Sequence, residues 1–263
     1  MHYWVWNIDP AIFRLGPFEV RWYGLFFALG FFLGFQIMTQ TYHREGRDIG
    51  ALSDLLLYLM LGTIIGARLG HVLFYQPDYY FTHPLEIIMI WKGGLASHGG
   101  FAGVMIALYF YLRKHAEMSF IELADRLTVP CLLAAALIRV GNFFNSEIVG
   151  TPSTLPWAIV FARVDDIPRH PAMLYEASAY FIVFCALYLA SLKTLVLQFP
   201  GRLFGAALTV CFLARFMIEF VKENQVPFEQ RLPLNMGQLL SIPFIVAGVY
   251  LVFASRAKPQ RAA

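Results

Sequence analysis

The chain has 263 residues, of which 59% are hydrophobic and only 14% are charged, against roughly 45–50% and about 25% in an average soluble protein. Its formal net charge is +3, which is too small to indicate a surface for nucleic acid. These values exclude a disordered chain, a basic nucleic-acid-binding domain and an ordinary soluble globule. They indicate a protein that crosses a lipid bilayer several times and has no nucleic acid as a partner.

Seven apolar runs follow one another along the chain, and each is long enough, or nearly so, to cross a hydrocarbon core of about 20 helical residues. Helices are expected because the open edges of strands leave backbone groups unsatisfied in lipid. The predicted helices are Trp22–Met38, Leu55–Leu73, Leu95–Leu112, Leu127–Val140, Ala172–Leu192, Leu203–Val221 and Met236–Phe253. The sequence therefore predicts an all-α polytopic membrane protein, a bundle of seven transmembrane helices.

The fourth of these runs is the weakest. It is short, it contains Pro130, and it leads into the polar pair Gly141-Asn142. We therefore expect this helix to end where its backbone opens into a cavity. Elsewhere, small residues four apart favour close approach of helices, and they recur at Gly30/Gly34, Gly62/Gly66/Gly70, Gly99/Gly103 and Gly201/Gly205.

The orientation follows from the lysines and arginines of the loops. With the N-terminus outside, nine of these cations lie in loops on the inner side of the membrane and seven on the outer side. The nine inner cations occupy less than half of the total loop length, and this higher density of positive charge inside favours the orientation. No signal-peptide pattern surrounds the first run, so it is expected to remain as a helix. Residues 1–255 are predicted to form one transmembrane domain with its N-terminus outside, and residues 256–263 a short basic cytoplasmic tail.

Three arginines lie within or at the ends of spans, where a charge costs roughly several kcal/mol unless it is paired or hydrated. Arg215 and Glu219 are four residues apart and could form a structural pair on one helix face. In the predicted orientation, however, polar groups from five spans fall in the same outer leaflet, which predicts a partly hydrated cavity there. The group comprises Tyr23, Arg68, His98, Arg139, Asn142, Asn145, Glu147, Arg215 and Glu219.

Arginines inside an apolar bundle suit an anionic ligand with an apolar body, and a guanidinium matches phosphate with its fork of donors. His98 is the best candidate base, because small neighbours (Ser97, Gly99, Gly100) leave space beside its imidazole. A lone histidine at a helix end can equally be an interfacial residue without a catalytic role. The absence of hydrolase, zincin and nucleotide-binding motifs argues against those classes. The cysteines lie in apolar runs without metal-ligand spacing, so neither a metal nor a cofactor is expected.

Residues 139–150 read RVGNFFNSEIVG, which resembles the signature GRxGNFxNxExxG of the bacterial phosphatidylglycerol–prolipoprotein diacylglyceryl transferases. Ile138 replaces the opening glycine, and Ser146 stands where glycine is common. Collinear matches to the same family cover nearly the whole chain, and they are Arg21–Leu25, Gly66–Gly70 with Leu73–Tyr75, Trp91–Gly100, Arg169–Pro171 with Tyr175-Glu176, Arg215–Phe220, and Met236–Gln238 with Leu240–Pro243.

The resemblance implies transfer of the diacylglyceryl group of phosphatidylglycerol to the thiol of the lipobox cysteine in a prolipoprotein signal peptide, in the bacterial inner membrane and on its outer, periplasmic leaflet. A thioether forms and glycerol phosphate leaves. It implies catalytic roles for His98, Arg215, Tyr23 and Glu219. Phosphatidylglycerol binding is implied for Arg139, Asn142, Asn145, Glu147 and Arg68.

Alternatives remain open at this stage. In one alternative, His98 takes the proton of the substrate thiol. In the other, no protein base is involved, and the arginines stabilise the thiolate directly. Intramembrane arginines also occur in lipid or anion transporters, but these are built from repeats, and the one irregular span here has no counterpart. A structural scaffold would explain the glycine spacings but not the polar groups in one leaflet.

Overall fold

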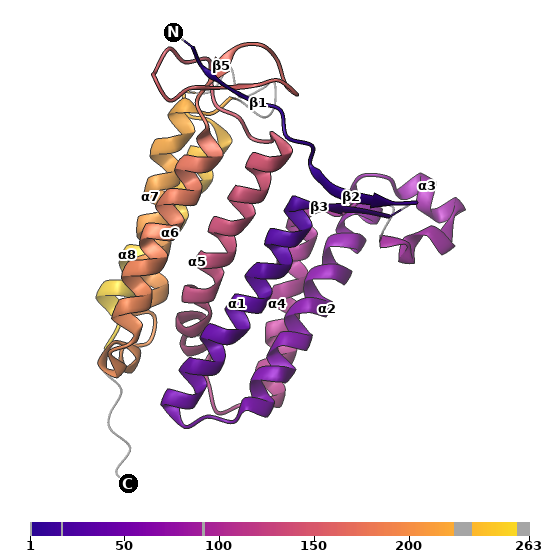
Figure 1. Cartoon of the computed structure of the whole chain (residues 1–263). Coiled ribbons are helices and arrows are strands. Elements are labelled where there is room, and N and C mark those ends of the chain that lie inside the picture. The colour runs from indigo at the N-terminus through magenta and orange to yellow at the C-terminus, as the bar shows by residue number, and fades with distance from the viewer. Residues whose placement is uncertain (1, 17, 91–92, 224–232, 257–263) are drawn as a thin grey trace. The chain divides into compact units, whose positions relative to one another are not determined.

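The computed structural model describes residues 2–16, 18–90, 93–223 and 233–256, and it is mostly helical (Figure 1). It divides into two compact units, one formed by Met1–Met38 and Ala124–Ala263, the other by Thr39–Leu123. Helices α1 (Trp22–Glu45) and α5 (Phe120–Asn145) each contain a boundary between them. A single domain over residues 1–255 therefore stays a prediction. The predicted tail after Arg256 lies outside the described residues, as do the predicted loop cations Lys92 and Arg231.

The larger unit contains α5 and three later helices. These are α6 (Ala172–Ser191), α7 (Arg202–Ile218), which continues as the 3-10 turn η4 (Glu219–Val221), and α8 (Met236–Ala254); η3 (Thr194–Gln198) joins α6 to α7. Helix α7 packs between α6 and α8. The buried side chains of Leu132, Val183 and Ala207 bring α5, α6 and α7 together. Their contact forms the apolar core of this unit along the middle of the helices.

Short strands occur in the same unit, so the prediction of an all-α protein was incomplete. Strands β1 (Trp4–Trp6), β4 (Ile159–Phe161) and β5 (Pro168–Arg169) form one sheet, with β1 parallel to β4 and β5 antiparallel to it. A hairpin joins β2 (Ala11–Leu15) to β3 (Phe18–Arg21). All five strands lie outside the apolar runs, where the lipid restriction on open strand edges does not apply.

The smaller unit is built on two helices, α2 (Ile49–Phe74) and α4 (Ser97–Lys114), packed along each other. The Asp48 carboxylate caps α2 by accepting hydrogen bonds from the backbone N–H groups of Gly50 and Ala51. Between the two helices the chain forms α3 (Pro77–Thr82) and the 3-10 turn η1 (Pro84–Ile88). At the end of α2, the N–H of Ala96 donates to the carbonyl of Ala67, which fixes where α4 begins.

Among the described residues, six helices are long and apolar enough to cross a membrane: α1, α2, α5, α6, α7 with η4, and α8. The ends of α6, of α7 with η4, and of α8 lie within one residue of the predicted runs, whereas α1 ends seven residues later and α2 begins six residues earlier than predicted. The remaining predicted span, Leu95–Leu112, corresponds to α4, which is a helix of 18 residues but is not one of these six. The chain is thus a polytopic membrane protein.

The prediction for the fourth span was wrong. Helix α5 is one of the two longest helices, with 26 residues, and it continues through Gly141 and Asn142 to Asn145. Pro130 lies inside it and is close to Gly34 of α1, where an added Cβ would lie 3.3 Å from the proline side chain. A proline removes one backbone hydrogen bond from a helix, and here the packing of the surrounding helices outweighs that loss.

The glycine spacings mark helix contacts, as predicted. In the smaller unit, Gly62, Gly66 and Gly70 of α2 face Gly99 and Gly103 of α4 so closely that a Cβ on any of them would overlap the backbone opposite. In the larger unit, Gly30 of α1 faces Ala134 of α5, and Gly205 of α7 faces Gly248 of α8. Small residues therefore set the spacing of three helix pairs.

We predict that Gly103→Ala destabilises the protein by about 1–3 kcal/mol, the usual effect of overpacking, because its new methyl group would meet the backbone of Gly62 and Gly66. Gly24→Ala is the control, since a Cβ there meets nothing within 4 Å. Thermal unfolding in detergent should show a lower midpoint for Gly103→Ala alone. Equal midpoints for the two variants would contradict a close α2–α4 contact.

Candidate functional site

A chain of hydrogen bonds begins in the last two turns of α5. Arg139 donates through Nη1 to Oδ1 of Asn142 at 3.0 Å, which the three-residue spacing on a helix allows. Asn142 donates to Oε2 of Glu147 at 2.9 Å, and Asn145 donates to Oε1 of the same carboxylate at 3.1 Å. Four predicted binding residues therefore lie together, and both asparagines hold Glu147.

The turn that brings Glu147 back has the hydrogen bonds of a Schellman motif, which commonly ends helices. The N–H of Ser146 donates to the carbonyl of Phe143, and the N–H of Glu147 donates to that of Asn142. Ser146 takes the left-handed position of the motif, with φ of 55°, where glycine is usual because it has no Cβ. This explains why glycine is common at this place in the family signature. Ile148 is also left-handed, with φ of 60°.

Glu176 of α6 lies at the centre of the ion pairs, and its side chain is 0% exposed. Its Oε2 lies 2.6 Å from Nε of Arg139, and its Oε1 lies 3.4 Å from Nζ of Lys222 and 4.0 Å from Nη1 of Arg215. A buried carboxylate is tolerated only when it is paired. Glu176 therefore requires these cations around it.

Glu219 provides the second carboxylate, at the end of α7. Its Oε1 lies 2.6 Å from Nζ of Lys222, just after η4, and 3.4 Å from Nη2 of Arg215, which lies four residues earlier on the same helical face. Its Oε2 accepts a hydrogen bond from Nδ2 of Asn235 at 3.3 Å. The predicted pair of Arg215 and Glu219 is confirmed, but Glu219 is shared with Lys222.

The first turn of α8 covers the Glu219 carboxylate. Asn235 caps this helix in a capping box with Gln238, whose side chain is also buried. Gly237 lies directly against Glu219, and any Cβ at this position would overlap the carboxylate. A carboxylate at the N-terminus of a helix is favoured by the helix dipole. Glycine at position 237 is therefore what lets α8 begin on top of Glu219.

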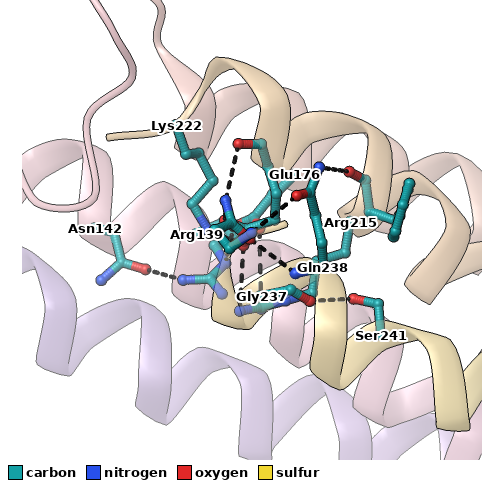
Figure 2. Close-up of polar contacts among 11 residues, drawn as sticks. Arg139, Asn142, Glu176, Arg215, Lys222, Gly237, Gln238 and Ser241 are labelled. Atoms are coloured by element: carbon teal, nitrogen blue, oxygen red, sulfur yellow. Dashed lines mark hydrogen bonds and ion pairs between the residues drawn. The ribbon is translucent and has the colours of Figure 1, made fainter. Parts of the chain in front are cut away.

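The ionised side chains among these form what we call the cation cluster, which comprises Arg139 of α5, Glu176 of α6, Arg215 of α7, Glu219 of η4 and Lys222 just after η4 (Figure 2). Three cations face two carboxylates in the cluster, and Glu147, which Asn142 links to Arg139, adds a third carboxylate beside it. A guanidinium has five N–H donors; within the described residues Arg139 donates one hydrogen bond, to Asn142, and its Nε forms an ion pair with Glu176. Arg139 thus keeps donors with which it can bind an anion. No group of three His, Cys, Asp or Glu side chains that could hold a metal occurs in the described ranges.

Tyr23 lies beside the cluster, in the first turn of α1. A Cβ at Gly141 would lie 3.0 Å from the ring and 3.2 Å from the Cα of Tyr23, so Gly141 lets α1 approach α5 here. The phenol is close enough to Arg139 and Glu147 for both charges to act on it. The structure therefore brings together the predicted residues Tyr23, Arg139, Asn142, Asn145, Glu147, Arg215 and Glu219.

The loop after the signature is fixed by Arg169, which donates to Asp165, to Glu223 and to the carbonyl of Gly150. These hydrogen bonds from Arg169 hold the pKa of the Asp165 carboxyl below its usual range. Gly150 also pairs with Lys222 in a β-bridge. The loop therefore connects the signature turn to the end of α7 through backbone contacts.

His98 belongs to the smaller unit, so its place beside the cation cluster stays a prediction. It lies in the first turn of α4 and is exposed. Its imidazole packs against the rings of Phe74 and Tyr75, with centroids 5.7 Å away in each case. An exposed imidazole at a helix N-terminus is open to an incoming substrate, which agrees with a base but does not distinguish it from an interfacial residue.

Arg68, in the same unit, makes its contacts with backbone groups. Its guanidinium donates to the carbonyls of Glu86, Ile87, Gly93 and Gly94 and lies over the Tyr80 ring. Four of its five donors therefore hold the segment between α2 and α4. These contacts make Arg68 a buried clamp on that segment, and its role in binding phosphatidylglycerol stays a prediction.

Two members of the cation cluster were missed in the sequence. Lys222 was counted as a loop cation, and Glu176 was noted only as part of a matching motif. A signal existed for Lys222, because it lies only three residues after Glu219 in the sequence. Glu176 has no charged residue three or four positions away, so only the packing of α6 against α5 and α7 shows its partners.

We predict that Ser146→Gly stabilises the protein relative to Ser146→Ala. A left-handed conformation costs an L-residue about 1–2 kcal/mol, part of which is offset by the greater unfolded-state entropy of glycine. Both variants remove the buried hydroxyl, so the difference between their free energies of unfolding, about 0.5–1 kcal/mol, reports the backbone effect alone. Thermal unfolding in detergent measures this difference. A glycine variant less stable than the alanine variant would contradict the left-handed turn.

Comparison with known proteins shows which family the sequence belongs to. The sequence model of the family described as prolipoprotein diacylglyceryl transferase matches residues 10–254. The phosphatidylglycerol–prolipoprotein diacylglyceryl transferase of Chloroherpeton thalassium is 49% identical over 258 residues, covering 98% of this chain and 96% of the relative. The protein of the same name from Tolumonas auensis is 47% identical over 256 residues, with coverage of 97% and 99%. This chain therefore belongs to the prolipoprotein diacylglyceryl transferase family.

Proposed function

We propose that this protein transfers the diacylglyceryl group of phosphatidylglycerol to the thiol of the lipobox cysteine in prolipoproteins. The observation that carries the proposal is the buried cation cluster, in which carboxylates hold Arg139 and Arg215 and Arg139 keeps donors beyond its contacts with Glu176 and Asn142, in a member of this transferase family. Membership of a transferase family sets aside the transporter and scaffold alternatives.

The reaction determines what the cluster has to do. The thiolate sulfur forms a bond to the glyceryl carbon that carries the phosphate ester, and the carbon–oxygen bond breaks. The electron pair leaves with the phosphate oxygen as glycerol phosphate, and the thiol proton passes to a base or to water. Negative charge therefore grows on the phosphate, and donors fixed in advance in a site of low dielectric stabilise such charge best.

The contacts divide the roles among the residues. Arg139 is positioned by Glu176 and Asn142 and binds the lipid phosphate with its remaining donors. Arg215, oriented by Glu219 and 31% exposed, holds the phosphate or the leaving group. Asn142 and Asn145 both donate to Glu147, which favours holding the signature turn over binding glycerol hydroxyls. Tyr23 donates a hydrogen bond at the mouth of the site.

We further propose that seven helices cross the bacterial inner membrane, with the N-terminus outside and the C-terminus in the cytoplasm. Within the larger unit, the cluster and Tyr23 come from the ends of α5 and α7 and the beginnings of α1 and α6, and the beginning of α8 covers Glu219. Because successive spans run in opposite directions, these ends and beginnings lie on one side of the unit. In the proposed orientation that end faces the outer leaflet, where a prolipoprotein signal peptide carrying a lipobox would arrive.

The direct test supplies the purified protein with phosphatidylglycerol and a fluorescent lipobox peptide. Mass spectrometry should show the peptide gaining a diacylglyceryl group and glycerol phosphate being released in equal amount. A peptide with serine in place of the lipobox cysteine is the control and should remain unmodified. Release of glycerol phosphate without thioether formation would contradict the transferase reaction.

We predict that Arg139→Ala and Arg215→Ala each abolish transfer while the protein still inserts into the membrane. Losing a charged hydrogen bond costs roughly 1.5–3 kcal/mol, and the loss is larger where charge develops. Lysine at either position should also fail substantially, because it lacks the planar fork of donors. Arg163→Ala, at an exposed loop position, is the control. Near-normal turnover of either cluster variant would remove that arginine from the mechanism.

His98 is tested against direct stabilisation of the thiolate by the arginines. If His98 takes the thiol proton, turnover falls at acidic pH as the imidazole becomes protonated, and His98→Gln loses both that dependence and most activity. General-base catalysis typically contributes about 10²–10⁴-fold. In the alternative, His98→Gln is mild and activity rises with pH toward the pKa of the substrate thiol. More than about a tenth of the activity with an unchanged pH profile would exclude the base.

A further inference from the structure

Lys222 is a cation of the cluster to which the roles above assign nothing. Its side chain is only 4% exposed, against 31% for Arg215. Its ammonium is held by two carboxylates, with Nζ 2.6 Å from Oε1 of Glu219 and 3.4 Å from Oε1 of Glu176. A group so enclosed is poorly placed to touch a lipid phosphate itself. Its effect has to pass through its neighbours.

Arg215 faces the same two oxygens from farther away. Its Nη2 lies 3.4 Å from Oε1 of Glu219, and its Nη1 lies 4.0 Å from Oε1 of Glu176. Lys222 is the closer cation at each oxygen. Because the attraction between charges weakens with distance, Lys222 takes the larger share of both carboxylates. Arg215 is left with the longer contacts and the greater exposure.

The backbone fixes Lys222 in this position. Lys222 pairs with Gly150 in an antiparallel bridge, and the N–H of Thr151 donates to the carbonyl of Val221. Any Cβ at Gly150 would crowd Val221 and His170, so glycine allows this close contact. The backbone of Lys222 is therefore held beside the segment that follows the signature turn.

We propose that Lys222 is a positioning residue of the transfer reaction: it occupies the carboxylate oxygens that face Arg215 and so keeps the Arg215 guanidinium available to the lipid phosphate. The proposal rests on the proposed function. Without Lys222, one positive charge would be lost beside Glu176 and Glu219, and Arg215 would turn onto both carboxylates. The phosphate would then have to displace a carboxylate from Arg215.

The test compares Lys222→Met, which removes the charge but keeps much of the length, with Lys222→Arg, which restores the charge. Lys222→Met should raise the KM for phosphatidylglycerol by about tenfold or more, as losing one charged hydrogen bond would, with the KM for the lipobox peptide unchanged. Lys222→Arg should recover most of the lipid affinity. Binding of glycerol phosphate, measured by calorimetry, should weaken in Lys222→Met by a similar factor.

Lys114→Met is the matched control, since Lys114 also lies 2.6 Å from a carboxylate, that of Asp54, outside the cluster. It should leave both KM values unchanged. If Lys222→Met does not fold, Lys222→Gln serves in its place. An unchanged KM for phosphatidylglycerol, or an equal loss for both substrates together with a lower melting temperature, would overturn the proposal. Failure of the wild-type protein to modify the peptide would instead contradict the proposed function, while glycerol phosphate binding would still report on Lys222.

Discussion

Burial of the Glu176 carboxylate is the constraint on which the arrangement of this site depends. A fully buried carboxylate needs cations around it, and Glu176 finds them on α5, on α7 and just beyond the end of α7. The ion pairs therefore fix how these helices meet at one end of the unit. They also fix where Arg139 points, because its Nε is committed to Glu176 and its remaining donors face elsewhere.

Backbone geometry provides the second part of the site. The Schellman turn at Ser146 ends α5 and returns Glu147 to Asn142 and Asn145. Glycines at 141, 150 and 237 stand where a Cβ would crowd Tyr23, His170 or Glu219. Beneath them, Trp6, Phe143, Phe161 and Met173 form an apolar core between the small sheet and the helices. The polar residues are thus held by close backbone contacts and by an apolar layer, which suits a site that must keep its donors fixed.

The guanidinium groups of Arg139 and Arg68, one in each unit, have different kinds of partners. Arg139 in the larger unit shares its donors between a carboxylate and an amide and keeps several for a ligand. Arg68 in the smaller unit gives nearly all of its donors to backbone carbonyls and so fixes the segment before α4. Two arginines predicted within spans thus differ in how many donors they keep: Arg139 retains several, as the proposed binding of phosphate requires, and Arg68 retains one. The partners of the guanidinium, and not the presence of an arginine in a span, distinguish the two.

The sequence by itself determined the class of the protein and the places of its long helices, and it pointed to most of the residues that the structure brings together, because apolar runs and charges inside them are local properties of the chain. The pairing of Arg215 with Glu219 could be predicted from their spacing on one helix. Only the tertiary structure decided that α5 continues past Gly141, that short strands form outside the spans, that Arg68 is a clamp, and that Glu176 and Lys222 complete the cation cluster. These features depend on contacts between segments far apart in the chain, such as Glu176 with Arg139 and Lys222 with Gly150, and such contacts leave no periodic pattern in the sequence.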